Sequence, residues 1–148
     1  SEMNEISICV SKGHKTTANI LKRKAFTVSM AEAGQVVACD YVGIVSGNKV
    51  ADKFARAGFH ATRSEFVDAP LIDELSVAME CRLKDYNPET SILRGEIVNV
   101  SVDERVLGEN GKVDASKVVP IIFDPFNNDY LKVGEKVGNA FSDGKILK

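Results

Sequence analysis

Two long segments, 77–83 and 92–102, constrain the fold most, because apolar and polar residues alternate along both of them. Alternation with a period of two is typical of a half-buried β-strand. The polar run 85–90 lies between the two segments and predicts a turn, so the segments predict a β-hairpin. We therefore expect the chain from Phe59 onwards to be mainly β.

Short strands and helices are predicted before this hairpin. Residues 6–10 and 25–30 alternate like strands, and apolar residues at helical spacing predict helices over 18–24, 35–45 and 52–57. Before the hairpin, 70–75 is expected to be an extended connection. After the hairpin only short elements are expected: a turn at 109–111, one helical turn at 114–117, and strands at 121–123 and 130–133.

These elements predict a mainly β fold with inserted helices, arranged as an antiparallel barrel. A doubly wound sheet is disfavoured, because the long alternation of strands and helices that it needs is missing. A length of 148 residues is suited to one domain with a real core, so we expect a single domain over 1–148.

Charge and hydropathy exclude two classes of partner. The formal net charge is -2 with both signs interspersed, and the densest basic run, 22–24, is typical of a helix end. This argues against nucleic-acid binding, which needs a concentrated basic patch. No apolar stretch approaches the length of about 20 residues that spans a membrane, and no signal peptide is visible, so we expect a cytoplasmic protein.

The cysteines favour neither a metal site nor a structural disulfide. Three cysteines at wide spacing and only two histidines argue against a zinc site. Cys9 and Cys81 occur in apolar strand patterns and are expected to be buried. Cys39 precedes a candidate ligand segment, although a buried helix position is the favoured interpretation.

The polar segment 11–17 is the first candidate site. It joins a strand to a helix, and helix N-termini bind phosphate because their first N–H groups are free and lie at the positive end of the dipole. Serine and threonine are also preferred as helix caps, so the residue pattern alone leaves both interpretations open. The side chains that would contact a phosphate are Ser11, Lys12, His14, Lys15, Thr16 and Thr17.

The segment 40–49 is the second candidate, because its small residues would let a backbone N–H approach a ligand beside a lysine. A helix end followed by a turn explains the same pattern. No nucleotide-binding, zinc-protease or serine-hydrolase motif is present, and no catalytic residue can be assigned. Asp73 and Glu74 are expected to be solvated, and neither His14 nor His60 has an evident partner. The residues of this second candidate are Ser46, Gly47, Asn48 and Lys49.

From about Ile6 onwards the chain resembles the flavin reductase-like FMN-binding split barrels, and among them the flavoredoxin type. The resemblance is carried by several long segments in the same order. They are 11–20, 25–29, 39–54, 57–60, 68–72, 95–98 and 134–138.

The resemblance implies an antiparallel split β-barrel, usually a homodimer, with FMN near the subunit interface. It also implies that 11–17 holds the FMN phosphate and that 46–49 lies near the flavin. The flavin would carry the redox chemistry while the protein supplies position and electrostatics.

Two departures from the family accompany this resemblance. The chain begins after an N-terminal segment that normally contacts the flavin ring, so we expect weak FMN binding and poor turnover. Asn128 stands where relatives often have histidine.

The leading hypothesis is an FMN-dependent oxidoreductase that uses NAD(P)H or a redox protein as electron donor. The alternatives are a flavin carrier without turnover and a dimeric scaffold that binds no flavin.

Overall fold

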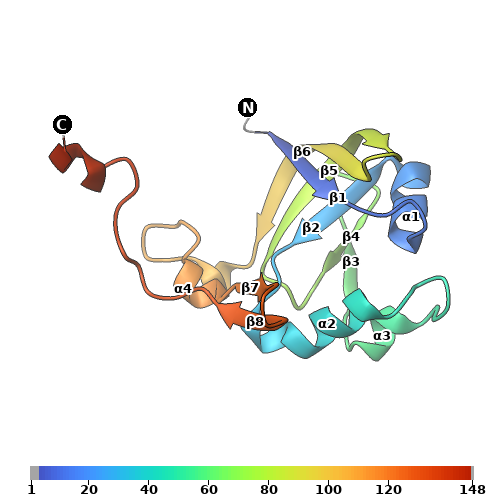
Figure 1. Cartoon of the computed structure of the whole chain (residues 1–148), viewed down its shortest axis with the longest axis horizontal. Coiled ribbons are helices and arrows are strands. Elements are labelled where there is room, and N and C mark those ends of the chain that lie inside the picture. The colour runs from blue at the N-terminus through green and yellow to red at the C-terminus, as the bar shows by residue number, and fades with distance from the viewer. Residues whose placement is uncertain (1–3, 148) are drawn as a thin grey trace.

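A computed structural model describes residues 4–147, so residues 1–3 and 148 of the predicted single domain lie outside the described part. The centre of the molecule is a four-stranded antiparallel sheet in the order β1–β6–β5–β2 (Figure 1). Its strands are β1 (Glu5–Cys9), β2 (Ala25–Ser29), β5 (Val77–Asn87) and β6 (Ile92–Val102).

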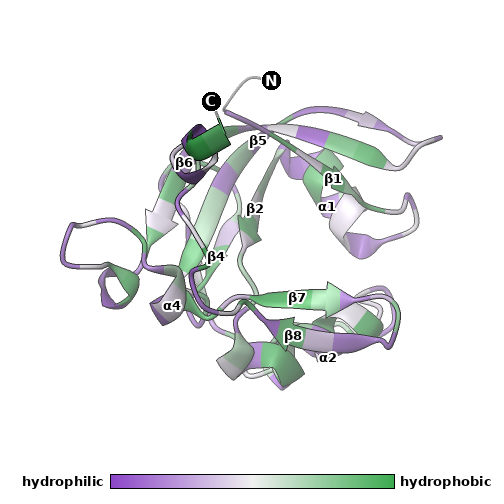
Figure 2. Ribbon diagram, turned by 60° about the vertical axis from the view of Figure 1, so that its left-hand side comes forward, coloured by the Kyte–Doolittle hydropathy of each residue, from purple (hydrophilic) through white to green (hydrophobic). Residues whose placement is uncertain are grey.

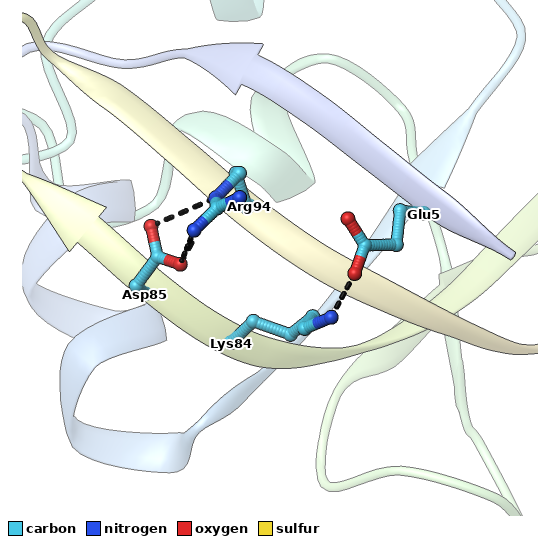
Figure 3. Close-up of polar contacts among 4 residues, drawn as sticks. All are labelled: Glu5, Lys84, Asp85 and Arg94. Carbon is cyan, nitrogen blue, oxygen red and sulfur yellow. Dashed lines mark hydrogen bonds and ion pairs between the residues drawn. The ribbon is translucent and has the colours of Figure 1, made fainter. Parts of the chain in front are cut away.

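The predicted hairpin is present, but its first strand is longer than expected. β5 continues through Asn87, which corrects the prediction that 85–90 forms the turn. Asp85 lies opposite Arg94 in the ladder, and its carboxylate accepts hydrogen bonds from the guanidinium at 2.6 to 3.2 Å (Figure 3). The ladder and this ion pair together outweigh the turn preference of the local sequence. A second pair, Lys84 with Glu5, links β5 to β1 across β6.

One face of the sheet carries the main core. Ile20 of helix α1 (Lys15–Arg23) packs with Phe26, Cys81 and Leu93, all of them buried. Gly95 fits this core because it has no side chain, since a Cβ there would lie 2.5 Å from the ring of Phe26.

The opposite face is covered by the loop between β3 (Ala61–Arg63) and β4 (Pro70–Ile72). The carboxylate of Glu80 is buried under this loop and accepts hydrogen bonds from Ser64, Asn99 and Ser101. Ser64 in turn accepts the backbone N–H groups of residues 66 and 67, each at 3.0 Å. The β3–β4 loop is therefore fixed to the sheet by one buried anion. The short strand β4 replaces the first part of the extended connection expected at 70–75.

Most of the remaining elements agree in type and position with the predictions, but β3 and the 3-10 helices at 104–106 and 143–147 were not predicted. The helix expected at 35–45 is a 3-10 turn (Ala33–Gln35) followed by α2 (Val36–Ile44), and the short helix is α3 (Lys53–Arg56). A 3-10 turn (Glu104–Val106), α4 (Ala115–Val118), β7 (Ile121–Asp124), β8 (Asp129–Lys132) and a 3-10 helix (Asp143–Leu147) complete the chain. In Figure 1 the β7–β8 hairpin lies beside α2, and the C-terminal segment extends away from the body.

The cysteine predictions are confirmed for one strand residue and wrong for the other. Cys81 is fully buried, whereas Cys9 is exposed. The reason is the alternation of side chains along the strand. Ile6, Ile8 and Val10 pack against the core, so Cys9, between the last two, faces outward. All three thiols are free. Within residues 4–147, no helix has the length and apolar character required to cross a membrane.

Candidate functional site

The turn that precedes α1 leaves the start of the helix open. The N-cap residue His14 has an extended backbone, with φ -76 and ψ 142, and no side chain caps the helix. The first turn contains no acidic residue. The N–H groups of the first helical residues have no acceptor inside the helix, and the dipole makes this end positive. The start of α1 is therefore suited to an anion.

Thr17 has a structural role in this turn, which differs from the contact expected of it. Its side chain is 1% exposed, and its hydroxyl donates to the carbonyl of Ser11 at 2.7 Å. The hydroxyl proton is thus committed to the backbone, and the side chain faces inward. Thr17 holds the turn in shape, while the neighbouring Thr16 is exposed.

The second predicted segment lies directly against the first. The side-chain amide of Asn48 donates to the carbonyl of Gly13 at 2.9 Å. Gly47 lies beside Lys15, because a Cβ at this glycine would be 3.3 Å from the Cβ of the lysine. Gly13 and Asn48 are 35 residues apart in sequence, and the fold joins their segments into one surface.

The 46–49 segment is held by the helices that flank it. The ammonium group of Lys53, in α3, donates to the carbonyls of Val42 and Val45 at 2.7 and 2.8 Å. These carbonyls belong to the end of α2, so the lysine satisfies acceptors that a helix end leaves free. The backbone N–H of Asn48 is 3.3 Å from the hydroxyl oxygen of Ser46, which shapes the turn itself.

The remaining predicted side chains are exposed to solvent on the two segments that these contacts join. They combine hydroxyl groups with positive charge, which is the chemistry that recognises phosphate. The exposed members are Ser11, Lys12, His14, Lys15, Thr16, Ser46, Asn48 and Lys49.

A cleft of about 920 Å³ begins at the same helix. Thr16 and Asn19 of α1 line one side of it, and apolar residues that include Phe54 and Ile72 line other parts. Sequence reasoning did not find this cleft, because its walls come from α1, β2, α3 and the β3–β4 pair, which only the tertiary fold brings together.

Two arginines and an aspartate also belong to the cleft lining. Arg23 pairs with Asp68 at 2.8 Å, and Arg63 approaches the same carboxylate at 3.7 Å. Arg23 belongs to the basic run that was expected to be solvated at the helix end. The carboxylate neutralises one of the two cations, so this part of the cleft has a net positive charge.

His60 has a partner that the sequence did not reveal. Its Nδ1 lies 2.6 Å from Glu74, and its backbone N–H donates to the same carboxylate at 2.9 Å. Glu74 is therefore engaged, which corrects the expectation that it is solvated, while Asp73 is exposed as expected. Hydrogen bonding to Glu74 raises the pKa of His60. The partners lie fourteen residues apart, and the antiparallel pairing of β3 with β4 brings them together.

Two further residues singled out by sequence lie away from this surface. Cys39 is half-buried on α2, and burial raises the pKa of its thiol. Asn128 occupies the β7–β8 turn with a left-handed φ of 59°, a conformation that asparagine adopts more readily than most residues. In the part of the chain that the structure describes, no three histidine, cysteine or acidic side chains are grouped to hold a metal ion.

Comparison with known proteins agrees with this architecture. Residues 4–123 match the family model described as the flavin reductase like domain. The structure of the flavoredoxin of Desulfovibrio vulgaris (Miyazaki F) is similar with a TM-score of 0.88 and 39% identity, covering 95% of this chain and 75% of that one. A flavoredoxin from Methanosarcina acetivorans gives a TM-score of 0.88 and 31% identity, covering 97% of this chain and 76% of that one.

A relative of known sequence is an uncharacterized protein of Aquifex aeolicus (strain VF5). It is 32% identical over 108 residues, which is 72% of this chain and 55% of that protein. The chain thus matches about half the length of this relative. The similar solved structures are split-barrel proteins, so the predicted antiparallel split β-barrel is confirmed.

Proposed function

The chain belongs to the flavin reductase-like family, and from this premise we propose that it binds FMN and acts as a flavin-dependent oxidoreductase. The observation that carries the proposal is the contact between the two candidate segments. Asn48 joins the 46–49 turn to Gly13 at the start of α1, and the cleft begins at Thr16.

The residues of the joined surface fit the phosphate of FMN. The open start of α1 supplies backbone N–H donors, and Thr16 supplies a hydroxyl. Lys12, Lys15 and Lys49 supply exposed positive charge without an acidic residue in the first turn of the helix. A dianionic phosphate would satisfy these donors together, because charge-assisted hydrogen bonds are the strong ones.

The cleft fits an aromatic ring system that is attached to this phosphate. Its apolar wall, with Phe54 and Ile72, would exclude water from one side of a flavin ring, and Asn19 offers polar atoms at the same side as Thr16. When bound, the flavin supplies the electron transfer between a donor and an acceptor. We propose NAD(P)H or a redox protein as the donor.

The protein's own residues position the cofactor in this proposal. Thr17 and Asn48 fix the turn, so its N–H groups are oriented before the ligand arrives. Preorganised donors lose less entropy on binding than mobile ones. We also propose a homodimer, as the family resemblance implies.

The proposal is tested by replacing Lys15 and Thr16 together with alanine. Each lost contact is worth about 1–3 kcal/mol, so FMN affinity should fall at least tenfold. Flavin fluorescence titration measures the affinity, and Lys22→Ala at the far end of the same helix is the matched control. Unchanged affinity in the double variant would remove the turn from the site. NAD(P)H consumption with FMN present distinguishes an enzyme from a flavin carrier.

A further inference from the structure

The C-terminal arm, residues 134–147, carries large apolar side chains that are not covered. Phe141 is 99% exposed and Leu147 is 90% exposed, and Val137 and Ile146 are exposed to a similar extent. Within residues 4–147, every hydrogen bond made by the arm is to another residue of the arm. For example, the backbone N–H of Asn139 donates to the carboxylate of Asp143 at 2.7 Å. Figure 2 shows the end of the arm coloured as hydrophobic. Exposed apolar side chains that gather into one patch mark an interaction site.

A second uncovered apolar surface is formed by α2 and the β7–β8 hairpin, and we call it the α2–hairpin surface. α2 has apolar residues on all sides, yet none of its residues is buried. A helix that is hydrophobic all round is normally buried. Val37 and Ile44 on α2 are 81% and 74% exposed, and Phe126 in the hairpin turn is 91% exposed.

The α2–hairpin surface is a connected unit. The hydroxyl of Tyr130, in β8, donates to Asp40, in α2, at 2.8 Å. The backbone N–H of Ile121, at the start of β7, donates to the carbonyl of Ala31 at 3.1 Å. Hydrogen bonds therefore connect the hairpin both to α2 and to the segment that precedes α2.

We propose that the C-terminal arm of each chain packs on the α2–hairpin surface of a second copy, so that two chains exchange arms. The arm extends away from its own body in Figure 1, which leaves its apolar residues free to reach another molecule. The arm contains two acidic and two basic residues, so its charges balance and do not repel a second copy.

The available area is large enough for a stable dimer. At about 150 Å² for Phe141 and about 100 Å² for each of the three aliphatic side chains, one arm offers roughly 450 Å² of surface. Two arms and two receiving surfaces of equal size would bury about 1,800 Å², within the range of about 1,200–2,000 Å² that stable interfaces bury. About two thirds of the available area reaches the lower limit of that range.

This arrangement would bring the second copy close to the candidate site. α2 ends at Ile44, two residues before Ser46 of the joined phosphate surface. An arm that covers Ile44 would therefore lie beside the flavin proposed above. The inference assigns contact surfaces to the proposed homodimer, and it does not require flavin to be bound.

The test replaces Phe141 with aspartate and measures the oligomeric state by light scattering at micromolar concentration. We expect a dimer for the unchanged chain and at least a tenfold weaker dimer for Phe141→Asp, because a buried charge opposes the contact. Ser142→Asp is the matched control, since it adds the same charge at the neighbouring polar position and should remain dimeric. The melting temperature of Phe141→Asp at a concentration where both chains are monomeric should be unchanged, because the arm does not support its own body.

A photo-crosslinking residue at position 141 then locates the arm. The chain that carries this residue is mixed with isotope-labelled chain. Crosslinks should form between labelled and unlabelled chains, and position 141 should be linked to α2 or to the β7–β8 hairpin. A monomeric unchanged chain, a dimer that Phe141→Asp does not weaken, or crosslinks within one chain or to another surface would each overturn the inference. FMN titration of the same variants keeps the two proposals apart. If Phe141→Asp leaves the dimer intact and the chain binds FMN, the arm exchange alone is overturned. If Phe141→Asp weakens the dimer as expected but the unchanged chain does not bind FMN, the proposed function alone is overturned.

Discussion

The buried carboxylate of Glu80 should be essential for the attachment of the β3–β4 loop, and Glu80→Gln tests this with a nearly unchanged shape. One carboxylate oxygen accepts from Asn99 and Ser101, and the other accepts from Ser64. The two lone pairs of the Ser64 hydroxyl are already occupied by backbone N–H groups. A glutamine can satisfy only one side of this network.

The loss of stability in Glu80→Gln follows from two hydrogen-bond donors, the glutamine NH₂ group and the Ser64 hydroxyl, that would face each other. If the glutamine oxygen takes the place next to Asn99 and Ser101, its NH₂ group points at a Ser64 hydroxyl that has no acceptor left. A buried donor without a partner costs about 1–3 kcal/mol. For a chain of this size, each kcal/mol lowers the melting temperature by about 2–4 °C. Glu80→Gln should therefore melt at a clearly lower temperature.

The pH dependence gives a second and independent readout. Burial alone would raise the pKa of Glu80, but the hydrogen bonds from Ser101, Ser64 and Asn99 outweigh it and lower the pKa below its usual value near 4.5. A carboxyl with a lowered folded pKa contributes stability above the unfolded pKa, and this contribution is lost as pH falls through the folded pKa. The stability difference between the native chain and Glu80→Gln should therefore shrink below about pH 4.5.

Urea denaturation at pH 7 and at a series of lower pH values measures both effects. Glu96→Gln, an exposed carboxylate on the neighbouring strand, is the control and should change the midpoint little. Equal midpoints for Glu80→Gln and the native chain at pH 7 would refute the reasoning, because the buried network would then contribute nothing. A difference that grows towards low pH would refute the assigned direction of the pKa.

Three further predictions follow from packing, accessibility and charge. Gly95→Ala should destabilise the fold by about 1–3 kcal/mol, because the added methyl group would overlap the ring of Phe26. Gly13→Ala meets no atom within 4 Å and should be tolerated, and denaturant midpoints measure the stability of both variants. A thiol reagent should modify exposed Cys9 rapidly and Cys81 only on unfolding, since burial raises the pKa of the latter to about 11. NMR titration should give His60 a pKa above 6.5. The interaction of protonated His60 with Glu74 then stabilises the fold below the pKa that His60 has in the unfolded chain, and this stabilisation is lost as pH rises through its folded pKa.

Each of these has a clear contrary result. Similar midpoints for the two glycine variants would show that the core ring moves aside without cost. Equal rates of modification for the two cysteines would contradict their different burial. A histidine pKa at or below the ordinary value would show that the carboxylate beside it is not engaged in solution.

Strand patterns were the part of the fold that the sequence predicted best. The boundaries of β6 were predicted to the residue, because its alternation is long and a turn precedes it. The end of β5 was missed, since Asp85 and Asn87 favour turns locally and only their partners on β6 keep them extended. The outward direction of Cys9 was also missed, because an apolar run does not reveal which alternate residues face the core.

The candidate site was predictable in its parts and not in its assembly. The 11–17 and 46–49 segments were found by their residue types and by family resemblance, but the Asn48–Gly13 contact that joins them depends on tertiary structure. The same holds for the His60–Glu74 pair, whose members look unremarkable in sequence. The inward position of Thr17 was missed because helix-start threonines serve both as ligands and as structural supports.

The central claim is that the start of α1 and the 46–49 turn together hold the phosphate of a flavin. Titrating the chain with FMN and with riboflavin, which lacks the phosphate, tests it most directly. We predict that FMN binds at least tenfold more tightly than riboflavin, and that the preference disappears when Lys15 and Thr16 are both replaced with alanine. Equal affinities for FMN and riboflavin in the native chain, or a preference that survives in the double variant, would contradict the claim.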